Sequence, residues 1–330
     1  MIEFEKNYYD EEVRLGYTID PLKKRNWAAL LEVLAEIDRV CKKHNITYFA
    51  DWGTLLGAVR HKGFIPWDDD LDICMKREDY EKFQRIIPLE FQDFEGTLEE
   101  KQENKLYCFS PLTAGRNMTV QTVVCNNNHI DFTDEHLKRY HGYPFVACID
   151  VFPMDYVPAD SPETETIYSI IKILDQIVFN DMLWDKEFNP INEDVVNSLK
   201  QIANLMHYKI DFNDKLRRQG FKLIDSLSKM YKKKNSKYIT CVPRYSNYRE
   251  RNHRYKKEWY DEVIYVPFEN IEIPIPAEYD KILTVIYGDY MTPVIYDAHG
   301  DDHRYQLETQ FDFKGQDPME FLYNKMKDYD

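Results

Sequence analysis

Four acidic residues crowd into positions 68–72, and this run constrains the fold more than any other feature of the chain. Asp70, Leu71, Asp72 and Ile73 alternate at the two-residue period of a β-strand, so both aspartates point to one face and both apolar residues to the other. Carboxylates this close repel each other, and a bound cation is the usual remedy. Paired oxygen ligands suit Mg²⁺ or Mn²⁺, which typically bridge to substrate phosphates. The run therefore predicts a strand that carries a divalent metal site.

A third carboxylate is available further along the chain. Asp150 lies inside the apolar stretch 146–152, where an unpaired charge would be costly, so we predict that it completes the metal site. The alternative for Asp150 is a structural ion pair with an arginine. The alternative for the acidic run is a capping turn ahead of a helix at Arg77, but Asp70 and Asp72 lie too far upstream to cap that helix.

The residues before the acidic run suit a phosphate. Gly53 and Gly57 flank a turn into a short predicted helix, whose first backbone N–H groups can face an anion. Arg60, His61 and Lys62 follow and offer positive charge for a diphosphate, with a plain surface role as the alternative for at least two of them.

Apolar periodicity divides the chain into a mixed part and a helix-rich part. The first helix is predicted to begin at Asp20-Pro21, because Asp is a favoured N-cap and Pro a favoured first helical residue. Predicted strands lie at 46–50, 71–75, 106–110, 120–125 and 145–152, and predicted helices at 20–44, 53–60, 77–87 (stopped by Pro88), 162–184, 192–209, 213–234 and 277–287. We expect an α/β (α+β) fold, with a mixed sheet and flanking helices over residues 1–158 and a helix-rich part over 159–330.

Composition excludes several classes of protein. The chain is 43% hydrophobic and 15% aromatic, which rules out a disordered chain. It has no apolar run of about 18 residues that could span a membrane, and its N-terminus lacks a signal-peptide layout, so we expect a cytoplasmic protein. The 6 cysteines occur singly, which disfavours a structural zinc site, and the net charge of −15 disfavours nucleic-acid binding.

One stretch of the chain is positively charged, although the chain as a whole is negative. Residues 215–257 carry 15 Lys/Arg and two acidic residues. Such a run is usually a solvated helix face or loop. The alternative is a docking surface for an anionic polymer or a peripheral contact with a membrane face.

Several segments together resemble the LicD family, which includes bacterial phosphocholine transferases and is related to fukutin and fukutin-related protein. The most specific segment begins with Trp52-Gly-Thr-Leu-Leu-Gly57, continues through Arg60 and ends with Gly-Phe-Ile-Pro-Trp-Asp-Asp-Asp-Leu-Asp at 63–72. Residues 149–155 and 278–291 resemble two further blocks of the family. The resemblance spans roughly residues 27–300.

The resemblance implies a nucleotidyltransferase-like fold, whose signature is Gly-Ser or Gly-Thr followed by an Asp-apolar-Asp-apolar strand. Gly53 and Thr54 match its first part and would contact substrate. The catalytic metal ligands that it implies are Asp70, Asp72 and Asp150, with Asp68 as a further candidate ligand.

The implied reaction is a metal-dependent transfer of a substituted phosphate, phosphocholine first among the candidates. A glycan hydroxyl, in a teichoic acid, lipopolysaccharide or capsule precursor, would attack one phosphorus of a CDP-linked donor such as CDP-choline, and CMP would leave. Mg²⁺ or Mn²⁺ would neutralise charge on the leaving phosphate. Asp150 would bind a second metal or accept the hydroxyl proton, and Arg60 would contact the diphosphate.

Other side chains are candidates for the substrate pocket. Trp52 and Trp67 are the aromatic residues nearest in sequence to the aspartates, and a quaternary ammonium binds π faces, with core packing as the alternative for both. Tyr287, Asp289 and His299 would line the donor or acceptor pocket, with helix capping and packing as the alternative.

Two other functions stay open. The enzyme would transfer another alcohol phosphate (ribitol, glycerol or ethanolamine) or a whole nucleotide, because nothing in the sequence fixes the donor headgroup. A protein of another class, a silent glycan-binding scaffold on this fold, is disfavoured by the intact aspartate set.

Overall fold

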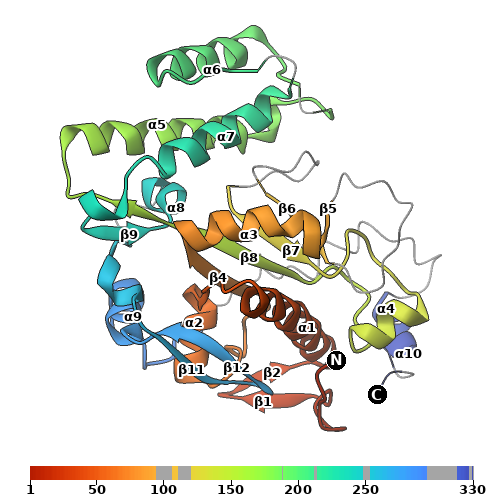
Figure 1. Ribbon diagram of the computed structural model, residues 1–330. Helices are drawn as coiled ribbons and strands as arrows, with labels where there is room; N and C mark the ends of the chain where they lie inside the picture. The colour runs from red at the N-terminus through yellow and green to blue at the C-terminus, as the bar shows by residue number, and fades with distance from the viewer. Residues whose placement is uncertain are drawn as a thin grey trace.

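The computed structural model describes residues 1–93, 106–110, 120–187, 189–211, 214–247, 253–295, 318–326 and 329. It confirms the predicted α/β (α+β) class, since a mixed sheet is flanked by helices (Figure 1). The sheet has eight strands, in the order β10-β9-β8-β7-β6-β5, with β4 paired to β8 and β3 paired to β4. These strands are β3 (Phe49–Ala50), β4 (Leu71–Lys76), β5 (Gln92–Asp93), β6 (Tyr107–Phe109), β7 (Thr122–Cys125), β8 (Cys148–Val157), β9 (Tyr238–Thr240) and β10 (Tyr255–Lys256).

The two central strands set the geometry of the site. β4 runs parallel to β8, and their register places Asp72 opposite Asp150. β7 pairs antiparallel with β8 on its other edge, and β9 pairs with its C-terminal end. Because side chains alternate along a strand, this register brings the predicted third carboxylate to the same face of the sheet as the second.

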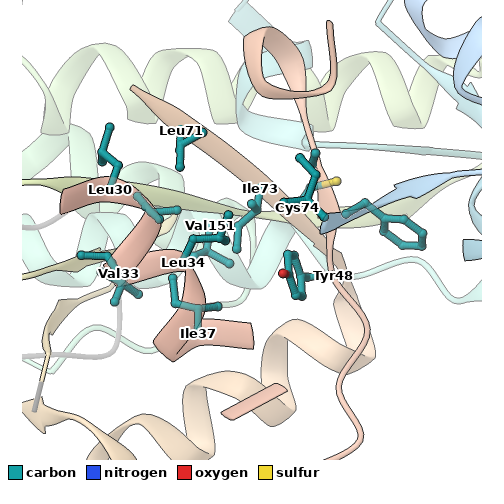
Figure 2. Close-up of a cluster of buried hydrophobic side chains, with 14 of the residues drawn as sticks. Leu30, Val33, Leu34, Ile37, Tyr48, Leu71, Ile73, Cys74 and Val151 are labelled. Atoms are coloured by element: carbon teal, nitrogen blue, oxygen red, sulfur yellow. The ribbon is translucent and has the colours of Figure 1, made fainter. Parts of the chain in front are cut away.

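Helix α1 (Pro21–Lys43) covers the opposite face of β4 and β8. Asp20 caps it, since its carboxylate accepts a hydrogen bond of 2.9 Å from the Lys23 amide. The apolar face of the helix packs on the apolar residues of the two strands, and Figure 2 shows this cluster: Leu30, Val33, Leu34, Ile37, Tyr48, Leu71, Ile73, Cys74 and Val151. The burial of one strand face leaves the aspartate face for chemistry.

The other helices and strands complete two apolar cores. The first core is built on the sheet with α1, α2 (Trp52–Arg60), α3 (Arg77–Glu90), α9 (Tyr279–Tyr287) and the hairpin of β11 (Val263–Phe268) and β12 (Ile271–Pro276). The second core lies among α5 (Pro162–Val178), α6 (Glu193–Leu205), α7 (Leu216–Ser228) and α8 (Val242–Asn247), and α5 to α7 extend away from the sheet in Figure 1. The remaining elements are β1 (Glu12–Arg14), β2 (Tyr17–Ile19), α4 (Asp134–Arg139), α10 (Pro318–Met326) and three short 3₁₀ turns at Asp181–Leu183, Lys233–Asn235 and Lys257–Tyr260.

The chain crosses between the cores more than once. Val157, at the end of β8, belongs to the second core, whereas Ile239 and Tyr255 return to the first. The division into 1–158 and 159–330 stays a prediction. Residues such as Ile239 and Tyr255 belong to the second predicted part but pack in the first core. None of the helices in the described ranges combines the length and the apolar character needed to cross a bilayer.

Several predicted bounds are wrong. Helix α3 continues through Pro88 to Glu90, because a proline near a C-terminus removes a single backbone hydrogen bond and the Phe91 amide still closes the last turn on Ile87. The strand predicted at 46–50 is limited to Phe49–Ala50. Helix α9 is not the last helix, since α10 follows it.

Candidate functional site

The predicted carboxylates gather where β4 begins. Burial raises the pKa of Asp72 well above its usual range, and the neighbouring charges of Asp70 and Asp150 raise it further, while Arg244 opposes them. Burial also raises the pKa of Asp68, and Asp70 adds to this both by its charge and through a side-chain hydrogen bond. The cluster therefore holds more negative charge than its surroundings neutralise.

The start of α2 is shaped to fit this cluster. A methyl group on Gly53 would lie 2.5 Å from the Asp68 Oδ2 atom, so any larger residue here would displace the carboxylate. The Thr54 hydroxyl is buried and accepts a hydrogen bond of 2.8 Å from the Asp72 amide. These two residues, predicted as substrate contacts, thus fix the backbone that presents the aspartates.

Two donors from α1 hold the acidic loop from the other side. The Trp27 indole N–H donates to the Asp68 carbonyl at 3.0 Å, and the Asn26 amide donates to the Asp69 carbonyl at 2.7 Å. The sequence analysis missed this role, because Trp27 fits the apolar face of its helix and the partners lie about 40 residues away. Neither Asn26 nor Trp27 has a sequence neighbour that would indicate a hydrogen bond to the acidic loop.

The C-terminal block closes on the same region. Arg60, at the end of α2, donates to the Tyr290 carbonyl at 2.8 Å and to His61 Nε2 at 2.8 Å. Burial raises the pKa of Tyr287, as do the nearby charges of three aspartates that include Asp68 and Asp72. Tyr287 is therefore close enough to the acidic cluster to be affected by its charge, and Arg60 ties α2 to the segment that carries Tyr287.

Comparison with known proteins agrees with this geometry. A sequence model described as LicD/FKTN/FKRP, nucleotidyltransferase domain, matches residues 45–161. The chain carries a LicD-family nucleotidyltransferase domain. The matched range contains all four aspartates of the cluster, and the signature that suggested the family lies within it.

One relative extends the similarity beyond the LicD-family domain, and two others match shorter stretches. The lipopolysaccharide cholinephosphotransferase LicD of Haemophilus influenzae is 28% identical over 265 residues, which cover 79% of this chain and 88% of that protein. An uncharacterised protein of Rickettsia typhi is 43% identical over 67 residues, or 22% of its length. Another from Rickettsia prowazekii is 47% identical over 79 residues, or 28% of its length.

The N-terminus of α2 in this LicD-family domain is strained and acidic. Trp52 has a positive φ of 43°, a conformation that costs a non-glycine residue about 1–3 kcal/mol and is concentrated at functional sites. Asp51 caps the helix by accepting from the Trp52 amide at 3.1 Å, and burial raises the pKa of Asp51 to about 6. Asp51 was missed by the sequence analysis, although an Asp directly before a short predicted helix is an N-cap signal.

Strand β8 carries two aspartates with different partners. The Gln121 amide donates to Asp150 Oδ2 at 3.1 Å. Five residues further on, Asp155 is fully buried and pairs with Arg77, with an Nε–Oδ1 distance of 2.6 Å. Arg77 also binds Asp225 of α7 at 2.8 Å. An ion pair of the kind considered for Asp150 is therefore present on this strand at Asp155.

Two predicted substrate contacts, Trp67 and Asp289, have neighbours other than the four aspartates of the cluster. Trp67 packs edge-on against Tyr17 and His61, each at a centroid distance of 6.2 Å. Asp289 is exposed and accepts a hydrogen bond of 2.7 Å from the Thr292 hydroxyl. His299 lies outside the described residues.

The aspartates suit a divalent cation that a substrate helps to bind. Among the side chains of the described residues, no three carboxylate, imidazole or thiol groups are gathered tightly enough to hold an ion by themselves. Mg²⁺, however, commonly uses one or two carboxylates and takes its other ligands from water and substrate phosphates. The mutual repulsion of Asp70 and Asp72 fits such a two-carboxylate set.

Much of the basic stretch 215–257 has partners within the chain. Arg217 donates to the Val178 carbonyl and to Asp181, both at 2.7 Å, and Arg254 pairs with Asp160. Part of the positive charge of this stretch is therefore paired with acceptors within the chain. A contact with an anionic polymer or a membrane stays a prediction.

Proposed function

We propose that this protein transfers phosphocholine from CDP-choline to a hydroxyl of a cell-surface glycan, in a reaction that depends on Mg²⁺ or Mn²⁺. The observation that carries the proposal is the register of β4 and β8, which faces Asp72 with Asp150 inside a LicD-family domain. The similarity to a lipopolysaccharide cholinephosphotransferase over most of both chains supports the headgroup and the class of acceptor.

Asp70 and Asp72 are the residues that would hold the metal against the diphosphate of the donor. A divalent cation at this position would neutralise charge that develops on the leaving phosphate. The acceptor oxygen forms a bond to the phosphorus next to choline, the phosphoanhydride bond breaks, and CMP carries the electron pair away. The Asp150 carboxylate, which lies opposite Asp72 in the register of β4 and β8, would accept the proton of the acceptor hydroxyl.

The other residues of the site would position the donor. Arg60 already uses two N–H groups on Tyr290 and His61, and its remaining donors would contact the diphosphate. Tyr287, which lies near the aspartates, would donate its hydroxyl to the donor or to the acceptor. We place the reaction on the cytoplasmic side, with the acceptor, in lipopolysaccharide, teichoic acid or a capsule precursor, approaching along the basic stretch 215–257.

The first experiment compares four donors. Thermal denaturation is followed with CDP-choline, CDP-ribitol, CDP-glycerol and CDP-ethanolamine, each with and without Mn²⁺, because a ligand that binds only the native state raises its stability. CMP release with a glycan acceptor is measured alongside. A metal-dependent shift and turnover with CDP-choline alone support the proposal. A response to another CDP-alcohol alone overturns the headgroup and keeps the chemistry.

Asp72→Asn is the diagnostic variant. Removal of one of several repelling carboxylates should raise the melting temperature of the metal-free protein, since functional sites trade stability for activity. The same change should abolish the metal-dependent shift and the turnover. Asp261→Asn, on an exposed surface aspartate paired with Lys76, is the matched control. No response of the wild-type protein to any donor with metal present would favour nucleotide transfer or a silent scaffold.

A further inference from the structure

A half-buried arginine from the helix-rich region lies over the site, and the sequence analysis did not assign it. Arg244 belongs to the short helix α8, and its guanidinium carbon lies 3.9 Å from the centroid of the Phe152 ring. The same carbon lies 5.2 Å from the Trp52 ring. Phe152 is two residues beyond Asp150 on β8, and Trp52 begins α2, so both rings belong to elements that build the aspartate cluster.

The guanidinium of Arg244 is held by its aromatic contacts alone. Within the described part of the chain it has no hydrogen-bond acceptor and no ion-pair partner. Two more deeply buried arginines have such partners: Arg77 reaches two carboxylates at 2.6 and 2.8 Å, and Arg217 reaches a carbonyl and a carboxylate at 2.7 Å. Arg244 therefore has N–H groups that a ligand entering the site can use.

The charges around Arg244 give the chemistry of that ligand. Burial alone would lower the pKa of Arg244, but the charges of Asp72, Asp51 and Asp150 raise it. The residue also lines a small recess together with Asp51 and Trp52. An isolated cation beside a cluster of carboxylates matches a ligand that presents anionic oxygens to the arginine and takes a metal ion between itself and the aspartates.

We propose that Arg244 binds phosphate oxygens of the donor, on the side opposite to Asp70 and Asp72. This inference rests on the proposed function for the identity of the donor, but the anion site itself does not depend on the headgroup. The planar guanidinium matches two phosphate oxygens, and the rings of Phe152 and Trp52 hold it in one orientation. The helix-rich region thereby supplies a substrate-binding residue to the LicD-family domain.

This assignment also changes the role of Trp52. A positive charge over its ring competes with a quaternary ammonium for the same face, so Trp52 serves to position Arg244 rather than to bind choline. The aromatic contacts of a choline headgroup would then come from other residues.

The test measures binding of the Mn²⁺–pyrophosphate complex by calorimetry, because this probe carries the phosphate oxygens without a nucleotide or headgroup. Arg244→Met keeps an apolar side chain between the rings and should weaken binding by about 10- to 100-fold, the value of one or two charge-assisted hydrogen bonds. Arg244→Lys keeps the charge without the planar fork and should recover part of the loss. Arg217→Met is the matched control, since Arg217 also lies over a ring, that of Trp184 at 5.9 Å, but binds structural acceptors.

The control should lower the melting temperature and leave pyrophosphate affinity within about twofold of the wild-type value. Unchanged affinity in both Arg244 variants would refute the inference, even if CDP-choline is turned over. Loss of pyrophosphate affinity in a protein that turns over no CDP-alcohol would instead refute the proposed function and keep the anion site. In an active enzyme, Arg244→Met should raise KM for the donor, whereas a purely structural role would lower the melting temperature without changing KM.

Discussion

The substitution Asp155→Asn should destabilise the protein more than any change in a surface ion pair. Asp155 is fully buried and accepts two hydrogen bonds from Arg77, with N–O distances of 2.6 and 2.9 Å. The amide keeps the shape of the side chain but removes its charge and turns one acceptor into a donor facing Arg77. A buried pair broken on one side costs about 3–5 kcal/mol.

The structure allows this cost to be converted into a melting temperature. Unfolding releases about 2.1 cal/mol/K of entropy per residue, or about 0.7 kcal/mol/K for a chain of 330 residues. A loss of about 3–5 kcal/mol therefore lowers the melting temperature by about 4–7 °C if both cores unfold together. Circular dichroism during heating measures this shift directly.

A matched surface substitution separates this effect from a general loss of charge. Asp160 pairs with Arg254 but is 58% exposed, so Asp160→Asn should cost less than about 1 kcal/mol. The reasoning fails if Asp155→Asn shifts the melting temperature by no more than Asp160→Asn does. Two separate transitions in the variant would show instead that Arg77 couples the two cores.

Two further predictions concern α2 and α7. Gly53→Ala should leave the melting temperature within a few degrees of the wild-type value, because two effects oppose each other. Alanine is more stable than glycine in a helix by about 0.5–1 kcal/mol. Its methyl group, however, would lie 2.5 Å from the Asp68 carboxylate and would displace it. Binding of Mn²⁺–pyrophosphate should fall at least tenfold, and calorimetry that finds no loss would refute a role for this close approach. Stability should also depend on the charge of Asp225. Burial would raise the pKa of this carboxyl group, but Arg77 and Lys229 hold the pKa below its usual value. Since the folded-state pKa lies below the unfolded value of about 3.9, this contribution is complete above that pH and is lost as the pH falls through the folded-state pKa. Urea unfolding should therefore show a stability difference between the wild-type protein and Asp225→Asn that is largest near pH 6 and shrinks towards pH 3, and a difference independent of pH would contradict it.

The sequence predicted the parts of the site whose signals are local. The strand period at 70–73 placed two aspartates on one face, and the apolar context of Asp150 marked it as a third, which the register of β4 and β8 brings opposite Asp72. The glycine at position 53 and the capped first helix were also recognised from residue type and spacing. Each of these predictions used a sequence pattern that spans about ten residues or fewer.

The parts that the sequence did not predict depend on distant contacts or on overridden propensities. Arg244 lies in a basic stretch that resembles a solvated surface, and its aromatic neighbours are about 90 and 190 residues away in the chain. The hairpin of β11 and β12 was missed because it contains Pro267, Pro274 and Pro276, which disfavour a strand. A two-stranded ribbon tolerates them, since many of its backbone amides need no partner on a second side.

Strand β8 fixes the number of residues between Asp150 and Asp155. Asp150 and Asp155 lie five positions apart, an odd number, so the pleat sends Asp150 towards the candidate active site and Asp155 towards Arg77 under α3. Phe152 follows Asp150 to the site face, and Val151 packs with α1 on the other face (Figure 2). One residue inserted or deleted within this stretch would exchange the two faces, whereas substitutions preserve them. Alignments of remote relatives should therefore contain no gap between these two aspartates, which offers a simple criterion for deciding which homologous chains retain both the chemistry and its anchor.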